Sequence, residues 1–251
     1  MNNPKNTVIE QFANSFGFKE VFFLPAERDD FDCIVLLIYP YNPFNENTYV
    51  PSYYIASNKS FHAMRELVKK LNEIGIVSEN VYLPIKQLAC RYNIGKQGKN
   101  TLLHTQKWGS RIVLYSLLVK GAAPSNYEHI VTEDYCSSCT KCIDVCKTGA
   151  ITNNGYIRER CIRNYMDNPP YPSWVENEIK TYSGCEKCME ICPYNAHIEK
   201  TAVPLEYINA LNPDKILLGD VKEAKEYLGS NLKTKRLLAD AQAIIKNSRQ
   251  L

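Results

Sequence analysis

Cys136-Ser137-Ser138-Cys139-Thr140-Lys141-Cys142-Ile143-Asp144-Val145-Cys146 is the stretch that decides the fold. Its cysteines are separated by two, two and three residues. With this spacing, the first three thiolates lie in one tight loop and reach three irons of one [4Fe–4S] cubane. The last thiolate follows on a helical turn that points away, so it reaches a different cubane. The stretch therefore predicts two clusters held close together.

A shorter cysteine run lies downstream and reads Cys185-Glu186-Lys187-Cys188-Met189-Glu190-Ile191-Cys192-Pro193. Both runs follow the spacing of bacterial two-cluster ferredoxins, although Lys147 stands where the first run usually has proline. A complete second copy would carry a cysteine at position 182, and the residue there is Tyr182. A tyrosine cannot replace the thiolate, and Cys161 between the two runs is the only nearby candidate for the missing ligand.

These cysteines divide into two complete ligand sets. We expect cluster I on Cys136, Cys139, Cys142 and Cys192, and cluster II on Cys146, Cys161, Cys185 and Cys188. The alternative is a pair of structural zinc sites, because zinc also accepts four cysteines and Cys-x2-Cys pairs are its common signature. The tight triple of cysteines crowds a single tetrahedral ion, which favours iron–sulfur. The two remaining cysteines, Cys33 and Cys90, are expected to be free and mostly buried.

Composition is typical of a globular protein. The chain has 251 residues, 45% hydrophobic and 23% charged, and a net charge of +3, which is too small to indicate nucleic-acid binding by itself. The N-terminal residues lack the features of a signal peptide, and the longest apolar stretches, 33–39 and 112–119, are far shorter than the ~20 residues of a membrane helix. We therefore expect a cytoplasmic protein without a membrane partner, in which clustered thiols bind metal rather than form disulfides.

Three regions follow one another in the predicted organisation. Residues 1–130 are predicted to form an α/β domain, residues 131–200 a double [4Fe–4S] ferredoxin domain, and residues 201–251 a short cap of C-terminal helices. In the first region, hydrophobic periodicity predicts helices and strands. The predicted helices are 5–16, 60–74 and 84–92; the predicted strands are 20–24, 32–39, 81–83 and 111–119; residues 94–100 are a predicted loop. Later helices are predicted at 142–147, 188–192 and 232–248.

At this point the chain resembles a known family, the epoxyqueuosine reductases, which are cobalamin-dependent and related to reductive dehalogenases. The cysteine pattern carries most of the resemblance, including the displaced Cys161 in Arg160-Cys161-Ile162-Arg163-Asn164-Tyr165 and the ending Cys192-Pro193-Tyr194-Asn195. Upstream, residues 55–65 are similar to the family's Tyr-Ala-Arg-Gly-Arg-Asp-Tyr-His segment, and residues 98–103 to its Gly-Lys-Asn/His-Thr-x-Leu segment. Residues 34–41 are similar to its strand that ends in a Tyr-Pro pair.

The resemblance implies an α+β fold: an α/β N-terminal domain of the cobalamin-reductase type with an inserted or appended two-[4Fe–4S] ferredoxin domain. It implies a reductase in which electrons pass from a low-potential donor of ferredoxin or flavodoxin type through two clusters to bound cobalamin. The substrate would be a small molecule, a protein-borne group or, as in the family, tRNA. The matching segments suggest cofactor contacts from His62, Gly98, Lys99, Asn100 and Thr101. From the residues alone, the basic loop around Lys99 is equally compatible with a phosphate or corrin contact and with a solvated turn.

One departure from the family pattern bears on catalysis. The family's catalytic acid is an aspartate in a Val-Asp-x-x-Pro-type segment, and the matching stretch here is Asn80-Val81-Tyr82-Leu83-Pro84. It contains no carboxylate, and Glu79 is the nearest one. The catalytic residue is therefore unassigned. The alternative function is an electron-transfer adaptor, resembling ferredoxin, without catalytic chemistry of its own.

Overall fold

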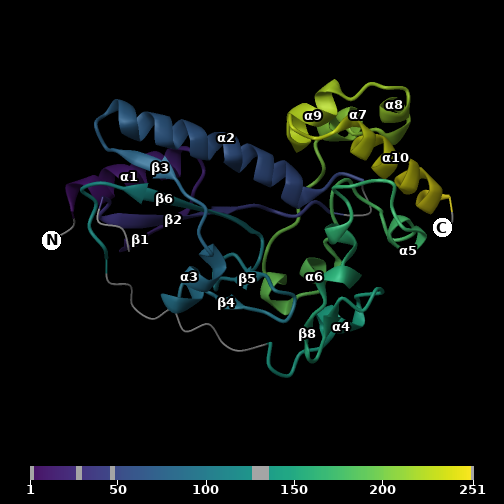
Figure 1. Cartoon of the computed structure of the whole chain (residues 1–251), viewed down its shortest axis with the longest axis horizontal. Coiled ribbons are helices and arrows are strands. Elements are labelled where there is room, and N and C mark those ends of the chain that lie inside the picture. Colours follow the sequence, from purple (N-terminus) through teal and green to yellow (C-terminus); the bar gives the residue numbers. More distant parts are fainter. Residues whose placement is uncertain (1–2, 27–29, 46–48, 126–135, 250–251) are drawn as a thin grey trace. The chain divides into compact units, whose positions relative to one another are not determined.

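The chain forms two compact units. The structure, a computed structural model, describes residues 3–26, 30–45, 49–125 and 136–249 (Figure 1). The first unit comprises Met1–Tyr41, Lys59–Gly98 and Leu102–Asp134, and the second comprises Asn42–Asn58, Lys99–Thr101 and Tyr135–Leu251. The predicted boundary at residues 130 and 131 lies outside the described residues. The C-terminal helices belong to the same compact unit as the cysteine-rich segment.

An antiparallel sheet with the strand order β1-β2-β6-β3 forms the centre of the first unit. Its strands are β1 (Glu20–Pro25), β2 (Cys33–Pro40), β6 (Ile112–Val119) and β3 (Ser78–Asn80). The continuous apolar run in β2 has the interior position that such a run predicts, because β2 pairs with β1 on one side and β6 on the other. The mixture of helices and sheet agrees with the expected fold class.

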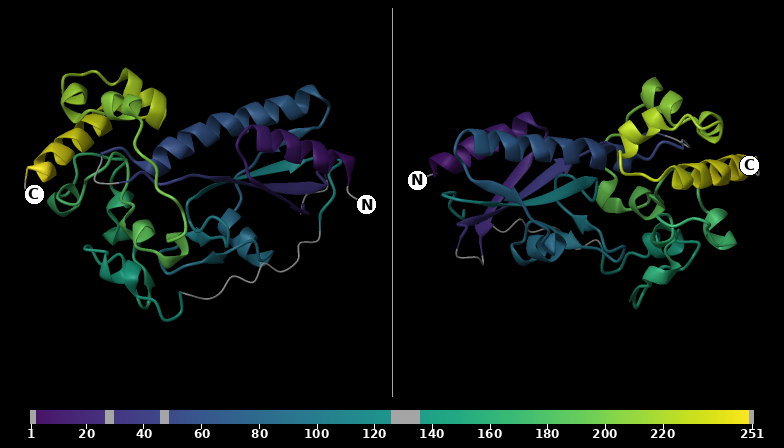
Figure 2. Two further views of the ribbon diagram at one scale, coloured as in Figure 1. Left: turned by 180° about the vertical axis from the view of Figure 1, so that it is seen from behind. Right: turned by 45° about the horizontal axis from the view of Figure 1, so that its top comes forward.

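Both faces of this sheet are covered. Side chains that alternate along β2 point to opposite faces, as the pleat of a strand requires. Val35 and Leu37 share a core with α1 (Pro4–Ser15) and α2 (Ser52–Glu73), whereas Leu36 and Ile38 share another with α3 (Ile85–Arg91). Figure 2 shows α1 and the long α2 on one face, and α3 with the β4–β5 hairpin (Lys96–Gln97 and Leu103–His104) on the other.

Three elements of the first region differ from the sequence-based expectation. Residues 94–100, expected to be a loop, include the short strand β4 (Lys96–Gln97), which pairs with β5. The strand expected at 81–83 is wrong: β3 is Ser78–Asn80, a polar edge strand paired only with β6. An edge strand tolerates polar side chains, and only Ser78 of the three is buried. Helix α2 also begins at Ser52 rather than at 60, because Ile55 in its first turns is buried in the core of the second unit.

The second unit is built mostly from short helices and turns. Its described elements before residue 200 are α4 (Lys141–Asp144), β7 (Ile151–Thr152), β8 (Gly155–Tyr156), the 3-10 helices η1 (Arg158–Arg160), η2 (Ile162–Asn164) and η3 (Pro193–Asn195), α5 (Ser173–Glu176) and α6 (Lys187–Glu190). Helices α7 (Leu205–Ala210), α8 (Pro213–Leu217), α9 (Lys222–Leu228) and α10 (Thr234–Ser248) follow. Leu237 and Ile244 of α10 pack in one core with Met166 and Tyr182 of the cysteine-rich segment. None of the described helices is long and apolar enough to span a membrane.

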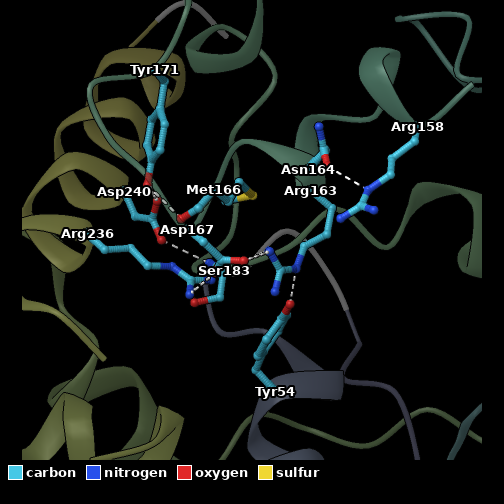
Figure 3. Close-up of polar contacts among 10 residues, drawn as sticks. All are labelled: Tyr54, Arg158, Arg163, Asn164, Met166, Asp167, Tyr171, Ser183, Arg236 and Asp240. Atoms are coloured by element: carbon cyan, nitrogen blue, oxygen red, sulfur yellow. Dashed lines mark hydrogen bonds and ion pairs between the residues drawn. The ribbon is translucent and has the colours of Figure 1, made fainter. Parts of the chain in front are cut away.

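A buried carboxylate joins α10 to the cysteine-rich segment (Figure 3). Asp240 is fully buried and accepts hydrogen bonds from the Tyr171 hydroxyl at 2.7 Å and from the Ser183 backbone N–H at 3.0 Å. Burial raises the pKa of Asp240 to about 6, although these hydrogen bonds and the nearby Arg236 act to lower it. Arg236 itself forms an ion pair with Asp167. The network fixes the helix against the chain between the two cysteine runs.

Candidate metal centre

The thiols predicted to hold cluster I lie near one another. Cys136 and Cys139 precede α4, Cys142 lies within it, and Cys192 follows α6. Burial raises the pKa of the Cys142 thiol, and its neighbours Cys136 and Cys139 add electrostatic repulsion. Burial likewise raises the pKa of Cys192 to about 11, and the neighbouring thiols that contribute are Cys142, Cys136 and Cys139. The second cysteine run therefore contributes its last thiol to the group formed by the first run.

The thiols predicted to hold cluster II form a second group. Burial raises the pKa of Cys188 to about 12, and the thiols that add to the effect are Cys185, Cys161, Cys142 and Cys146. Burial also raises the pKa of Cys185, with Cys161 and Cys146 among its neighbours. Cys142 of the first group thus lies near Cys188 of the second, so the two groups are adjacent. Adjacent cubanes are what a relay of electrons requires.

Hydrogen-bond donors are directed at several of these sulfurs. Burial acts to raise the pKa of Cys146, but the Thr148 hydroxyl and the backbone N–H groups of Ile151, Ala150 and Thr148 lower it below its ordinary value. At Cys185, where burial raises the pKa, the backbone N–H of Lys187 also acts to lower it. Backbone donors around thiolate sulfurs are typical of iron–sulfur sites, where they stabilise the charged ligand. The donor set therefore fits bound thiolates.

Zinc and a cubane place different demands on the spacing of four thiolates. Four thiolates about 2.3 Å from one zinc ion would lie about 3.8 Å from each other. In the part of the chain that the structure describes, no three Cys, His, Asp or Glu side chains converge tightly enough to hold a single metal ion. A cubane binds each thiolate at a different iron and so holds the sulfurs farther apart. A pair of cubanes therefore does not require the close convergence of thiols that a zinc ion requires.

Tyr182 occupies the core where a further ferredoxin cysteine would stand. Its side chain is fully buried, packs edge-on against Tyr49 with ring centroids 6.4 Å apart, and belongs to the core beneath α10. Its backbone N–H donates to the Tyr49 carbonyl at 3.1 Å. Cys161 lies instead between η1 and η2, next to the β7–β8 hairpin. Tyr156 of that hairpin forms a hydrogen bond with the Cys161 thiol, and burial together with this contact raises the pKa of Tyr156.

The family resemblance assigns cofactor binding to the loop around Lys99. In the structure, this loop contacts the two cysteine loops. The Lys99 backbone N–H donates to Cys136 Sγ at 3.3 Å, and its ammonium donates to the carbonyls of Cys139 at 2.9 Å and Ser137 at 3.1 Å. The Asn100 side-chain amide donates to the Cys188 carbonyl at 3.4 Å. The Lys99–Thr101 segment therefore touches both cysteine runs.

The other predicted cofactor residues are placed separately. Thr101 has a left-handed backbone with φ of 64°, and the Gly98 N–H donates to the Leu102 carbonyl at 3.0 Å. His62 is an exposed residue of α2 and lies edge-on to the Phe61 ring, with centroids 5.7 Å apart. His62 and Gly98 belong to the first compact unit, whereas Lys99, Asn100 and Thr101 belong to the second. The contacts of these five residues with a cofactor stay a prediction.

The segment that matches the family's catalytic acid is largely open to solvent. Tyr82 is 92% exposed, and Glu79 is an exposed residue of β3. The two cysteines outside the clusters are Cys33, buried in the sheet with a pKa raised to about 11 chiefly by burial, and the partly buried Cys90. The cysteine interpretation thus leaves these two thiols in packing roles.

Three residues near the thiols escape prediction from the sequence. Thr148 and Tyr156 form hydrogen bonds with the thiols of Cys146 and Cys161 respectively, and Glu178 forms ion pairs with Lys187 at 2.7 Å and Lys147 at 3.9 Å. No spacing rule marks such residues. For Thr148 and Tyr156 the available signal is a position within five residues of a cysteine, and Glu178 has no such signal.

Comparisons with known proteins find a similar cluster-binding domain and similar longer chains. The family described as a 4Fe-4S double cluster binding domain matches residues 135–195, a range that includes all eight cysteines. The epoxyqueuosine reductase of Cyclobacterium marinum is 31% identical over 156 residues, which cover 56% of this chain and 49% of that protein. That of Cellulophaga algicola is 29% identical over 205 residues, covering 76% and 64%. The chain thus spans less than two thirds of the length of either relative.

Solved structures share the fold at low sequence identity. Epoxyqueuosine reductase from Streptococcus thermophilus superposes with a TM-score of 0.69 at 16% identity, covering 97% of this chain and 81% of that one. An epoxyqueuosine reductase bound to an epoxyqueuosine-modified tRNA stem loop gives 0.68 at 18% identity, with the same coverage. A catabolic reductive dehalogenase in complex with 3-bromo-4-hydroxybenzoic acid gives 0.58 at 14% identity, covering 99% and 37%.

The matched family model identifies residues 135–195 as similar to a 4Fe-4S double cluster binding domain. Among curated proteins, the chain is similar to epoxyqueuosine reductases, and it shares their fold.

Proposed function

We propose that the chain is an iron–sulfur oxidoreductase that holds two [4Fe–4S] clusters and delivers electrons to a bound cobalamin, which reduces a substrate. The observation that carries the proposal is the arrangement of eight thiols in two adjacent groups of four, with backbone N–H donors directed at their sulfurs. When bound, cubanes supply one-electron transfer at potentials set by nearby hydrogen bonds, charge and burial.

In this proposal, Cys136, Cys139, Cys142 and Cys192 hold cluster I, and Cys146, Cys161, Cys185 and Cys188 hold cluster II. The chain's task at these sites is to bind and orient the thiolates and to offset their charge. Burial raises the pKa values of the Cys188 and Cys192 thiols, so their thiolate forms are unfavourable without metal. Coordination by iron would offset the negative charge of these thiolates. The amides at Cys146 are already in place for this purpose.

Cobalamin enters the proposal through the relatives. One reductive dehalogenase of the same fold, with a TM-score of 0.56 and 14% identity, is described as suggesting a mechanism for B12-dependent dehalogenation. The candidate contacts are His62, Gly98, Lys99, Asn100 and Thr101. The Lys99 ammonium and the Asn100 amide bond to carbonyls of the cysteine loops, so this segment would hold a ligand close to the cysteine loops. When bound, cobalamin supplies a strongly reducing cobalt centre.

The test is anaerobic titration of the reconstituted protein with cobalamin. We expect saturable binding with the change to the base-off absorption spectrum, in which the corrin loses its own lower ligand. His62→Ala, which alters an exposed helix residue without touching a buried one, is the first variant to compare with the wild type. A cluster-loaded chain that leaves the cobalamin spectrum unchanged at all concentrations would contradict the cobalamin part of the proposal.

A second candidate is an electron-transfer adaptor that docks a partner protein and has no substrate of its own. The observation in its favour is the segment Asn80–Pro84, which supplies no carboxylate where the family has its acid and leaves Tyr82 exposed. Cluster-loaded protein that reduces a partner without binding cobalamin would select the adaptor.

For the reductase, tRNA is a candidate substrate, because one epoxyqueuosine reductase of the same fold is bound to an epoxyqueuosine-modified tRNA stem loop.

A further inference from the structure

Lys99 approaches the cluster I loop with both its backbone and its side chain. Its backbone N–H donates to the sulfur of Cys136 at 3.3 Å. Its ammonium is held by the carbonyls of Cys139 at 2.9 Å and Ser137 at 3.1 Å. The positive charge is also an electrostatic neighbour of the Cys142 thiol. Lys99 as a whole thus lies beside three of the four predicted cluster I ligands, and its ammonium is held at the carbonyl of Cys139 and near Cys142.

The charge of Lys99 has no acidic partner among the described residues, in contrast to the cation beside cluster II. Lys187 is an electrostatic neighbour of Cys185, but its ammonium lies 2.7 Å from the carboxylate of Glu178, which offsets it. Lys99 is partly buried, so solvent screens its charge less than that of an exposed lysine. Lys99 therefore places an ammonium beside cluster I without a carboxylate partner among the described residues, whereas Lys187 beside cluster II is paired with Glu178.

We propose that the Lys99 ammonium sets the reduction potential of cluster I and raises it. The inference rests on the proposed function, because it presupposes that the cysteines hold clusters. Reduction adds one electron from a low-potential donor to the cubane, and no bond forms or breaks. The cubane with its four thiolates becomes one unit more negative, so a fixed cation nearby stabilises the reduced form more than the oxidised form. Lys99 is not itself a cluster ligand. It contacts the loop that carries the ligands and acts on cluster I through its charge.

The experiment is an anaerobic redox titration followed by electron paramagnetic resonance, on wild type and Lys99→Met. Methionine is unbranched and only one atom shorter than lysine, and it keeps the backbone N–H bond to Cys136 but removes the charge. We expect the equilibrium constant for reduction of cluster I to fall about tenfold, which corresponds to about 59 mV for a one-electron couple. Cluster II should change much less. The signal of cluster II is identified as the one whose shape changes in Cys161→Ser.

Two control variants separate charge from structure. Lys99→Arg keeps the charge and should restore the wild-type potential of cluster I. Lys141→Met removes a charge from an exposed residue of the same loop, and it should leave both potentials close to those of the wild type. If Lys99→Met does not retain cluster I, Lys99→Gln, which keeps a donor for the loop carbonyls, is titrated in its place with the same expectation.

An unchanged cluster I potential in a Lys99 variant that carries both clusters would overturn the inference and leave the proposed function intact. Equal shifts of both clusters, or a Lys99→Arg protein that behaves like Lys99→Met, would also overturn it. Wild-type protein without iron, sulfide or a reducible signal would instead refute the clusters themselves and the inference with them.

Discussion

Replacing Asp240 with asparagine should change how the stability of the second unit depends on pH. Burial raises the pKa of Asp240 to about 6 in the folded chain, against about 3.9 for an unperturbed aspartate. The folded state therefore binds the proton more tightly than the unfolded state, and the stability that this group contributes is lost as pH rises through about 6. Across the whole range the loss is about 3 kcal/mol, at about 1.4 kcal/mol per pKa unit.

Between pH 5 and pH 7.5 the expected loss from this one group is about 1.4 kcal/mol, by the linkage of the two pKa values. The measurement is the thermal midpoint of cluster-loaded wild type and Asp240→Asn across this range, at one scan rate. The wild-type midpoint, relative to that of the variant, should fall by about 3–5 °C. Taking the difference removes the pH dependence of the clusters, which both proteins share, and any constant cost of poorer hydrogen bonds to Tyr171 and Ser183.

Asp220→Asn, which changes an exposed aspartate of the same unit, is the matched control and should track the wild type at every pH. Tyr171→Phe removes the 2.7 Å hydrogen bond to the carboxylate and should move the transition to higher pH. A wild-type midpoint that runs parallel to that of Asp240→Asn from pH 5 to 7.5 would refute the reasoning, because Asp240 would then titrate alike in the folded and unfolded chains.

Further predictions address the ligands, the core and the substrate. Cys161→Ser should impair cluster II and largely spare cluster I, and Cys192→Ser should do the reverse; electron paramagnetic resonance that finds both clusters intact in either variant would contradict the ligand sets. Leu237→Ala, at a fully buried position of α10, should lower the free energy of unfolding by about 2–5 kcal/mol in denaturant titrations, and a loss below about 1 kcal/mol would show that the core described here is wrong. Reduced protein with cobalamin should form little or no queuosine from epoxyqueuosine-containing tRNA, because Asn80–Pro84 offers no carboxylic acid to deliver a proton; formation at the rate of a longer family member would show that another group replaces the missing acid.

Sequence patterns predict those parts of the structure that depend on the local spacing and chemistry of residues. The continuous apolar run of β2 predicts an interior strand, since both faces of the sheet are covered. The spacing of the cysteines implies that Cys192 joins the first run, and the structure brings its thiol beside Cys142. Tyr182, excluded as a ligand by its chemistry, is buried in the core.

Contacts between distant segments are less accessible to sequence reasoning. The β3 strand consists of Ser78, Glu79 and Asn80, whose polarity gives no periodic signal because an edge strand needs little burial. The Lys99 loop matches a family segment by its residues, but no local pattern shows that its ammonium bonds to carbonyls about forty positions away. Tyr156 is likewise recognisable as a partner of Cys161 only once the β7–β8 hairpin is in place.

The central claim is that eight cysteines hold two cubanes, and the most direct test is the metal and sulfide content of anaerobically purified protein. Two [4Fe–4S] clusters predict about eight iron and about eight acid-labile sulfide per chain, with a broad absorption shoulder near 400 nm. The Cys33→Ser and Cys90→Ser variants, which alter only the thiols outside the ligand sets, should give the same content. About two zinc per chain with no acid-labile sulfide would contradict the account and identify the site as a pair of structural zinc centres.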